Sequence, residues 1–104
     1  MQRVIKILSR EEIEDGLKKL PGWKHKGGRI EKTFEFKEFM DLVNFVSDLA
    51  PFCEKLDHHP DMIIEHRNIT FKLWRFDIGM KITNFDFIMA QKIEELIKKY
   101  NLRS

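Results

Sequence analysis

The spacing of apolar residues changes several times along this chain, and these changes limit the folds it can adopt. In some segments apolar side chains recur every three or four residues, and in others they alternate with polar ones. The first spacing is typical of helices and the second of strands. We expect helices from Ser9 to Leu20, from Lys37 to about Leu56 and after Thr83, and strands over 23–25, 29–36, 62–66 and 69–76.

Short turns join these strands in pairs. Gly27-Gly28 suits a tight hairpin because glycine tolerates positive φ, and Arg67-Asn68 is a second short turn. This order predicts an α+β fold: a four-stranded antiparallel sheet with three helices packed on one face, as a single domain over residues 1–104. The sheet edges and open face need polar residues or a cover, and an oligomer is one way to cover them.

The helix ends carry their own signals. Ser9 followed by Glu12 reads as a capping box, and Thr83 caps the last helix with Asp86 in its first turn, where negative charge suits the helix dipole. Pro51 lies inside the second helical pattern. Because proline removes a backbone donor and crowds the preceding turn, it predicts a kink there, or a break with Pro51 opening a new turn.

Charge and composition argue against some partners. The formal net charge is +2, and the charged residues, 35% of the chain, mix both signs without a basic run that would favour nucleic acid. The first residues are too few and too charged for a signal peptide, and no apolar run approaches membrane-spanning length. The single cysteine, Cys53, fits a reducing compartment and is expected in the core. We expect a cytoplasmic protein with no nucleic-acid or membrane partner, and the many Lys, Glu and Ile residues hint at a thermophile.

The dipeptide His58-His59, followed by Pro60, is the strongest candidate for chemistry. Histidine gains and loses a proton near neutral pH. Pro60 disfavours helix at His59, so the pair is expected on the turn that leaves the second helix. Such a turn can aim imidazoles into a cleft. It can also be a solvated turn that happens to carry two histidines.

A face of the last predicted strand ends in the aromatic pair Trp74 and Phe76. Flat rings at a strand end can stack on a planar heterocycle, and a subunit contact is an equal alternative. A metal site built from His58, His59 and His66 is a weaker hypothesis. Adjacent histidines are poor chelators, and the chain has no Cys-x-x-Cys or His-Glu-x-x-His spacing.

These residues together resemble the pterin-4a-carbinolamine dehydratase family, from about Leu20 to Leu96. The specific piece is Glu54-Lys55-Leu56-Asp57-His58-His59-Pro60-Asp61, supported by Gly22-Trp23, Phe34-Glu35-Phe36-Lys37-Glu38-Phe39 and Thr83 with Asp86 before Ala90. The resemblance implies the same element order and assembly into homodimers or homotetramers. It implies that a 4a-hydroxytetrahydropterin loses water to give a quinonoid dihydropterin, in support of tetrahydrobiopterin recycling, without a metal or organic cofactor. Carbon–oxygen cleavage needs an acid for the departing hydroxyl and a base for a ring proton, and imidazole can act as either.

The resemblance also suggests roles for individual residues. His58, His59 and Asp86 are the expected catalytic group, with His58 as acid or base and Asp86 orienting a histidine. His59 and Asp57 are expected to help hold the pterin. The remaining expected substrate-binding residues are His66, Trp74, Arg75, Phe76 and Asp77.

One departure of the chain from the family bears directly on catalysis. The family carries a further catalytic histidine on the last strand, in a Thr-His setting, and counting from His58 places Phe76 there. Three interpretations follow: His66 substitutes from the neighbouring strand, the enzyme works more slowly with His58 alone, or the protein binds a pterin or a protein partner without catalysis. Loss of one general acid or base typically reduces a rate by about a hundred- to ten-thousandfold.

Overall fold

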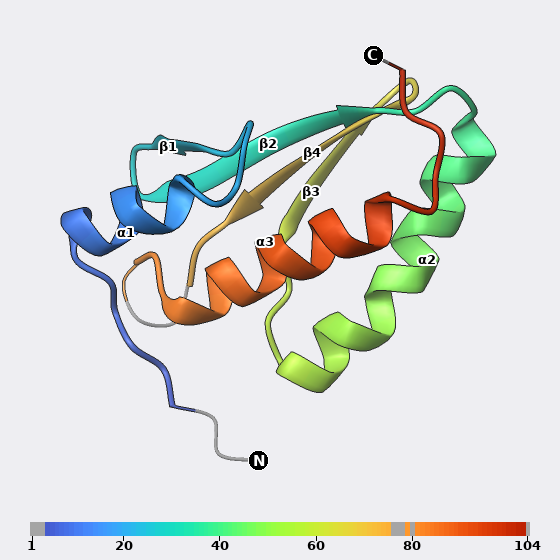
Figure 1. Ribbon diagram of the computed structural model, residues 1–104. Helices are drawn as coiled ribbons and strands as arrows, with labels where there is room; N and C mark the ends of the chain where they lie inside the picture. The colour runs from blue at the N-terminus through green and yellow to red at the C-terminus, as the bar shows by residue number, and fades with distance from the viewer. Residues whose placement is uncertain (1–3, 76–78, 80, 104) are drawn as a thin grey trace.

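The computed structural model describes residues 4–75, 79 and 81–103, and its elements follow the predicted order (Figure 1). The elements are α1 (Arg10–Leu17), β1 (Lys24–Lys26), β2 (Arg29–Glu35), α2 (Phe39–Leu56), β3 (Asp61–Glu65), β4 (Asn68–Leu73) and α3 (Asn84–Ile97). The α+β architecture predicted from the periodicity is therefore confirmed.

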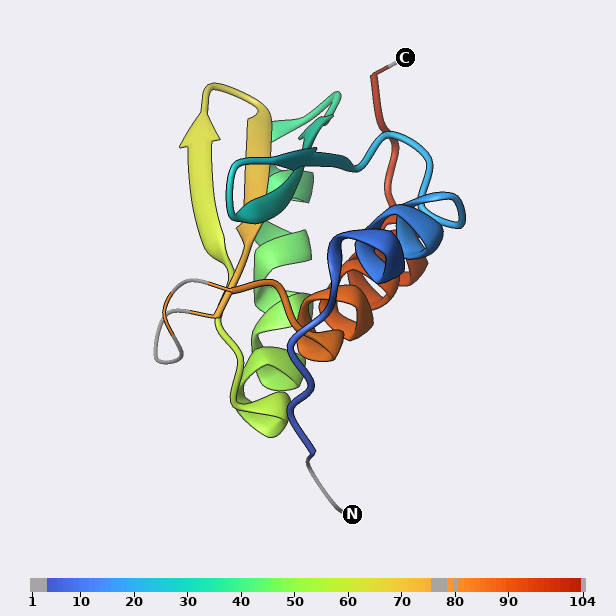
Figure 2. The ribbon, with the colours of Figure 1, turned by 90° about the vertical axis from the view of Figure 1, so that its left-hand side faces the viewer.

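The four strands form one antiparallel sheet in the order β1-β2-β4-β3. The register between β2 and β4 pairs Ile30 with Leu73 and Phe34 with Ile69, so apolar residues lie opposite apolar ones on the same face. The helices cover that face, as Figures 1 and 2 show from two directions. One face of the sheet thus belongs to the core, and none of the helices that the structure describes covers the other.

The core lies between the sheet and the two longer helices. Alternate residues of β4 are buried together with Ile30 and Phe34 of β2, and they meet buried residues at helical spacing on α2 and α3. The ring of Phe71 from β4 contacts Phe34 of β2 and Phe45 of α2, with ring centroids 6.1 and 6.0 Å apart. Each such side chain contributes about 1.5–3 kcal/mol on burial, and this packing fixes the sheet against α2 and α3.

The predicted capping box at Ser9 is present, and the predicted Thr83 cap of α3 is also part of a capping box, which Asp86 completes. The Ser9 hydroxyl accepts from the Glu12 N–H while the Glu12 carboxylate accepts from the Ser9 N–H, and Thr83 and Asp86 make the reciprocal pair at α3. Helix α1 ends at Leu17, earlier than the predicted Leu20, and the chain continues through turns to Trp23.

Three local predictions need correction. Helix α2 runs without interruption through Pro51, so the break, which was the alternative to a kink, is wrong. The carbonyl that loses its donor there belongs to Ser47, and both residues are exposed, so water can satisfy it. The second hairpin turns at His66-Arg67 rather than at Arg67-Asn68, because Asn68 already pairs with Glu65.

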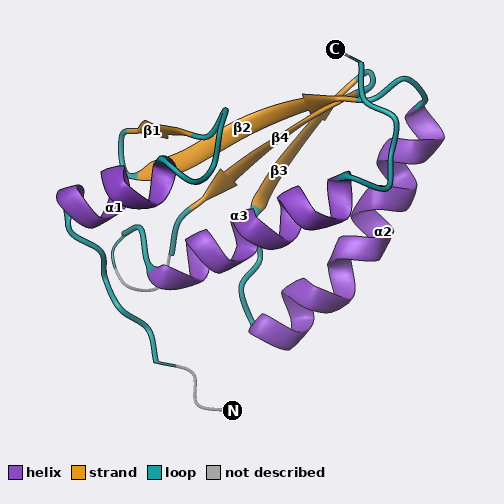
Figure 3. Ribbon diagram, viewed as in Figure 1, coloured by secondary structure: helices purple, strands orange, loops and turns teal. Residues whose placement is uncertain are grey.

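The last strand is also shorter than predicted. Strand β4 ends at Leu73, and Arg75 forms an isolated antiparallel bridge with Lys81. Phe76, predicted as the strand's last residue, lies outside the described residues. Figure 3 shows that the connection from α2 to β3 lies at the end of the sheet where β4 ends. Within the described ranges, no helix is long and apolar enough to cross a bilayer.

Candidate active site

The site is built where α2 ends. Asp57 is the C-cap of α2 and has left-handed backbone angles (φ 54°, ψ 46°), a conformation that Asp tolerates better than most residues. Its N–H donates to Glu54, and the next N–H, of His58, donates back to the Cys53 carbonyl over 3.1 Å. These bonds satisfy carbonyls that the end of a helix leaves open, and they turn the chain sharply at His58.

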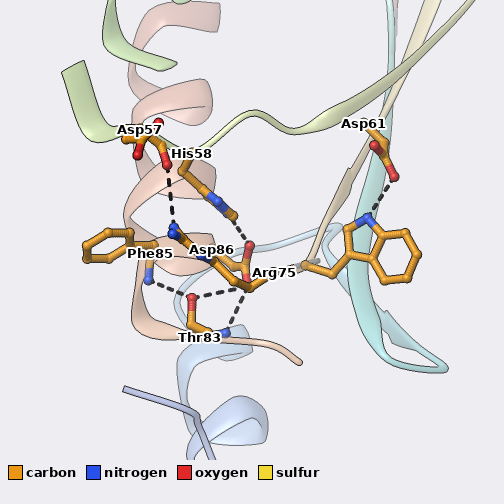
Figure 4. A network of polar contacts seen from close by, with 8 residues as sticks. Asp57, His58, Asp61, Arg75, Thr83, Phe85 and Asp86 are labelled. Atoms are coloured by element: carbon orange, nitrogen blue, oxygen red, sulfur yellow. Dashed lines mark hydrogen bonds and ion pairs between the residues drawn. The ribbon is translucent and has the colours of Figure 1, made fainter. Parts of the chain in front are cut away.

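His58 and Asp86 form a buried pair between α2 and α3 (Figure 4). The His58 side chain is 4% exposed and that of Asp86 is fully buried, and Nε2 lies 2.5 Å from Oδ1. An imidazole and a carboxylate so removed from water are stable only when each satisfies the other. The pair therefore fixes the orientation of the His58 ring.

The second oxygen of Asp86 is held by its own helix. Oδ2 accepts the Thr83 backbone N–H over 2.8 Å, and the Thr83 hydroxyl in turn accepts the Phe85 N–H. The positive end of the α3 dipole also favours a carboxylate in this first turn. Asp86 thus has two functions, because its Oδ2 completes the capping box of α3 and its Oδ1 binds His58.

This arrangement determines which His58 nitrogen is available for chemistry. A carboxylate only accepts hydrogen bonds, so Nε2 carries the proton that points to Asp86, and Nδ1 is the acceptor in the neutral ring. Nδ1 has no hydrogen-bond partner among the described residues. Every fully buried side-chain nitrogen or oxygen of those residues does have a partner, so Nδ1 is not fully buried. Nδ1 therefore keeps access to solvent and can exchange a proton with a guest molecule.

Phe85 and Arg75 form the wall beside the His58 ring. The edge of Phe85 meets His58 with centroids 6.4 Å apart and planes at 65°. The Arg75 guanidinium lies over Phe85, with Cζ 5.7 Å from the ring centroid, and its Nη1 donates to the Asp57 carbonyl over 3.4 Å (Figure 4). The wall thus combines α3, the end of α2 and the segment after β4.

The neighbouring histidine lies in a different environment. The His59 side chain is 59% exposed, and its Nε2 lies 3.6 Å from the exposed Glu54 carboxylate. Asp57 is also exposed, while half-buried Trp74 donates its indole N–H to Asp61 over 2.7 Å. The structure therefore joins only His58 to Asp86, and it places His59 and Asp57 on the surface next to them.

His66 does not lie at this site. It occupies the β3–β4 turn with φ 58° and is exposed, at the opposite end of β3 from the residues that follow His58. The hypotheses that His66 replaces the missing histidine, or completes a zinc site with His58 and His59, do not fit this geometry. Within the described part of the chain, no three His, Cys, Asp or Glu side chains gather as a metal site. Phe76 and Asp77, two further predicted site residues, lie outside it.

Cys53 has no place in the chemistry of this site. Its side chain is buried in the core, as predicted, and burial raises the pKa of the thiol. A thiol with a raised pKa is a poor nucleophile near neutral pH. The contribution of Cys53 is its backbone carbonyl, which accepts the His58 N–H.

Residues 6–96 match the model of the family described as pterin 4 alpha carbinolamine dehydratase. The chain belongs to this family. A relative from Sulfurisphaera tokodaii is 40% identical over 89% of this chain and 99% of its own length. Another, from Thermosynechococcus vestitus, is 42% identical over 86% of this chain and 93% of its own. Both carry the name pterin-4-alpha-carbinolamine dehydratase, given provisionally.

Two solved structures share the fold. A transcriptional coactivator/pterin dehydratase from Brucella melitensis superposes with a TM-score of 0.81 and 30% identity, over 88% of this chain and 98% of its own. A pterin dehydratase-like protein identified as a RuBisCO assembly factor in the alpha-carboxysome has a TM-score of 0.60 and 19% identity, over 72% of this chain and 88% of its own. At that identity the second likeness concerns the fold alone.

Some site residues had weaker signals in the sequence. The sequence placed Asp86 in the first turn of a helix capped by Thr83, but nothing local showed that the same carboxylate reaches His58. Phe85 and the contact from Arg75 to the Asp57 carbonyl have no motif of their own. They depend on the packing of three segments that are far apart in the chain.

Proposed function

We propose that this protein removes water from a 4a-hydroxytetrahydropterin to give the quinonoid dihydropterin. The observation that carries the proposal is the buried His58–Asp86 pair, which fixes an imidazole and leaves its Nδ1 available for proton exchange. Membership of the pterin carbinolamine dehydratase family supports the same reaction.

One imidazole can serve both proton transfers in turn. In its protonated form, Nδ1 of His58 gives a proton to the hydroxyl on C4a as the carbon–oxygen bond breaks, and water leaves. The neutral Nδ1 then takes the proton from a ring nitrogen of the cationic pterin, which becomes the quinonoid product. The substrate thus loses one hydroxyl and one proton, and His58 returns to its starting form. Asp86 orients the ring throughout and stabilises its positive charge.

The pterin would lie against the Nδ1 edge of the buried His58 ring. Asp57 and His59 lie on the surface there, and we assign them to substrate contact rather than to proton transfer. Trp74 supplies a half-buried aromatic surface at the end of β4. Phe76 and Asp77 remain predicted substrate-binding residues.

The experiment is a stopped-flow assay in which the 4a-carbinolamine is generated in the cuvette and its absorbance followed. The proposal expects the decay rate to rise in proportion to the protein concentration. A rate equal to that in buffer would remove the dehydratase assignment.

A second candidate function is pterin binding without turnover, and Phe76 at the position of the family's histidine favours it. Pterin would then quench tryptophan fluorescence while the decay rate stayed at the buffer value. Trp74→Phe is the matched control. Its remaining tryptophan, Trp23, is buried in the core and would still give the fluorescence signal of the folded protein. A quench that disappears in this variant places the pterin next to Trp74. If neither a pterin nor a protein partner binds, the second candidate fails.

Self-association is a further part of the proposal. Strand β3 is an edge strand, and its Ile63 and Ile64 are 39% and 47% exposed. An exposed apolar edge favours pairing with another chain. We expect a dimer or tetramer by light scattering, and a monomer at assay concentration would contradict this.

A further inference from the structure

We propose that Arg75 is a positioning residue that holds His58 in the geometry needed for proton transfer, and that it is not a pterin ligand. This inference rests on the proposed function. Arg75 lies directly before Phe76, the position at which the family's second histidine is expected. The question is therefore what an arginine contributes beside a single catalytic imidazole.

The contacts of Arg75 join the two halves of the site. Its Nη1 donates to the carbonyl of Asp57, the residue immediately before His58. Its guanidinium lies over Phe85, the residue immediately before Asp86, and Phe85 itself packs edge-on against His58. Arg75 thus contacts the neighbour of each member of the His58–Asp86 pair.

The backbone of Arg75 adds a third connection. Its N–H donates to the Lys81 carbonyl over 2.8 Å, and the Lys81 N–H returns the bond over 3.2 Å. Lys81 leads directly into Thr83, whose N–H holds Asp86. A change at the Arg75 side chain therefore affects the turn at Asp57 and the ring of Phe85, while the backbone bridge can remain.

The planar guanidinium suits these contacts better than an ammonium group. It can donate a directed hydrogen bond from its edge while its face stacks on an aromatic ring. Lysine at this position would keep the charge, a hydrogen-bond donor and the attraction of a cation to the Phe85 ring, and would lose the planar geometry. Glutamine would keep a donor for the Asp57 carbonyl and lose the charge.

The charged and titratable groups around His58 come from several elements. Asp86 binds the ring from α3, Arg75 reaches the Asp57 carbonyl from the segment after β4, and Cys53 accepts the His58 N–H with its backbone carbonyl at the end of α2. The proposal concerns the orientation of the ring among these groups. Misplacing a reacting group by about 1 Å can reduce a rate by about a hundredfold.

The test compares Arg75→Gln and Arg75→Lys with Arg67→Gln. Arg67 is a matched control because its Nη1 also donates to a backbone carbonyl, that of Lys37, over 3.3 Å, but at the opposite end of the sheet. We expect R75Q to lower kcat by about ten- to a hundredfold with little change in KM, R75K to recover part of the loss, and R67Q to match the wild type.

Two other kinetic outcomes would overturn the proposal. A rise in KM with unchanged kcat in R75Q would return Arg75 to pterin binding. Wild-type kcat and KM in R75Q would show that Arg75 has no role. If R75Q does not fold, R75K alone decides, since a lowered kcat supports the proposal and an unchanged one contradicts it.

A spectroscopic readout separates this inference from the proposed function. The ¹⁵N NMR signals of the His58 ring in the free protein report its tautomer and the order of its surroundings. We expect them to shift or broaden in R75Q and to stay unchanged in R67Q; unchanged signals in R75Q would contradict the inference. If the wild type has no dehydratase activity, the proposed function fails, and this NMR comparison still tests the role of Arg75.

Discussion

The two ends of the β3–β4 hairpin have similar local geometry and very different surroundings. At one end Asp57 is left-handed (φ 54°) just before His58, and at the other His66 is itself left-handed (φ 58°). Yet the His58 side chain is only 4% exposed and binds the fully buried carboxylate of Asp86, whereas His66 lies in an exposed turn.

The arginines at the two ends repeat this contrast. Arg75 and Arg67 each donate Nη1 to a backbone carbonyl, over 3.4 and 3.3 Å. Only Arg75 also lies over an aromatic ring that contacts a buried imidazole. A left-handed residue and an arginine bound to a backbone carbonyl are therefore not enough to form a site, since both ends of the hairpin have them. The site depends on α3, which brings Asp86 to one end of the sheet.

The largest expected effect comes from removing the imidazole. His58→Gln keeps a donor for Asp86 but cannot exchange a proton near neutral pH, so the dehydration rate should fall by about a hundred- to ten-thousandfold. His66→Ala should retain the wild-type rate. The stopped-flow assay measures both rates. Equal losses in the two variants would contradict the claim that only the His58 end of the hairpin takes part in catalysis.

Asp86→Asn tests the tautomer argument. The Thr83 N–H needs an acceptor, so the amide oxygen should take the place of Oδ2 and the amide NH₂ should face His58. Nε2 then becomes the acceptor and Nδ1 carries the proton, the reverse of the proposed state. We expect a rate loss of about a hundredfold or more, as for carboxylates that orient a catalytic histidine. A near-normal rate with the fold intact would contradict the assigned tautomer.

A smaller effect is expected from glycine at the two left-handed positions. His66→Gly should stabilise the protein by about 0.5–1 kcal/mol, because strain relief exceeds the extra entropy of the unfolded chain. Asp57→Gly should change stability by only a few tenths of a kcal/mol, since Asp tolerates this conformation. Urea unfolding measures both, and the opposite order would show that His66 is not strained.

The smallest effect is a pH dependence at the hairpin end. Tyr100 donates to Asp48 and packs edge-on against Phe36, and the bond to Asp48 raises the pKa of the phenol to about 12. A raised pKa means that this bond stabilises the fold fully below pH 10, with the contribution lost as pH rises from 10 to 12. Tyr100→Phe should remove this slope from unfolding free energies measured over that range. An identical slope in the variant would assign it to other groups.

Much of the fold followed from local patterns in the sequence. The element order, the capping box at Ser9 and the Thr83 cap of α3 were predicted because their signals lie within a few neighbouring residues. The Pro51 break was wrong because an exposed carbonyl can do without its donor. The second turn was misplaced by one residue because pairing of Asn68 with Glu65 and Glu35 determines the register.

The site was only partly predictable for a related reason. His58 and His59 are adjacent, and nothing local decides which ring turns inward. That choice follows from the left-handed Asp57 and from Asp86, which is 28 positions away in the sequence. The contact between Arg75 and the Asp57 carbonyl likewise joins distant segments.

The most direct test of the central claim is a ¹⁵N NMR titration of the His58 ring with a stable pterin, 7,8-dihydrobiopterin. The claim is that Nδ1 faces the substrate while Nε2 stays on Asp86. We therefore predict that pterin shifts the Nδ1 signal strongly and the Nε2 signal weakly, with His66 unaffected. A saturating pterin that leaves the Nδ1 signal unchanged, or that shifts His66 instead, would contradict the account.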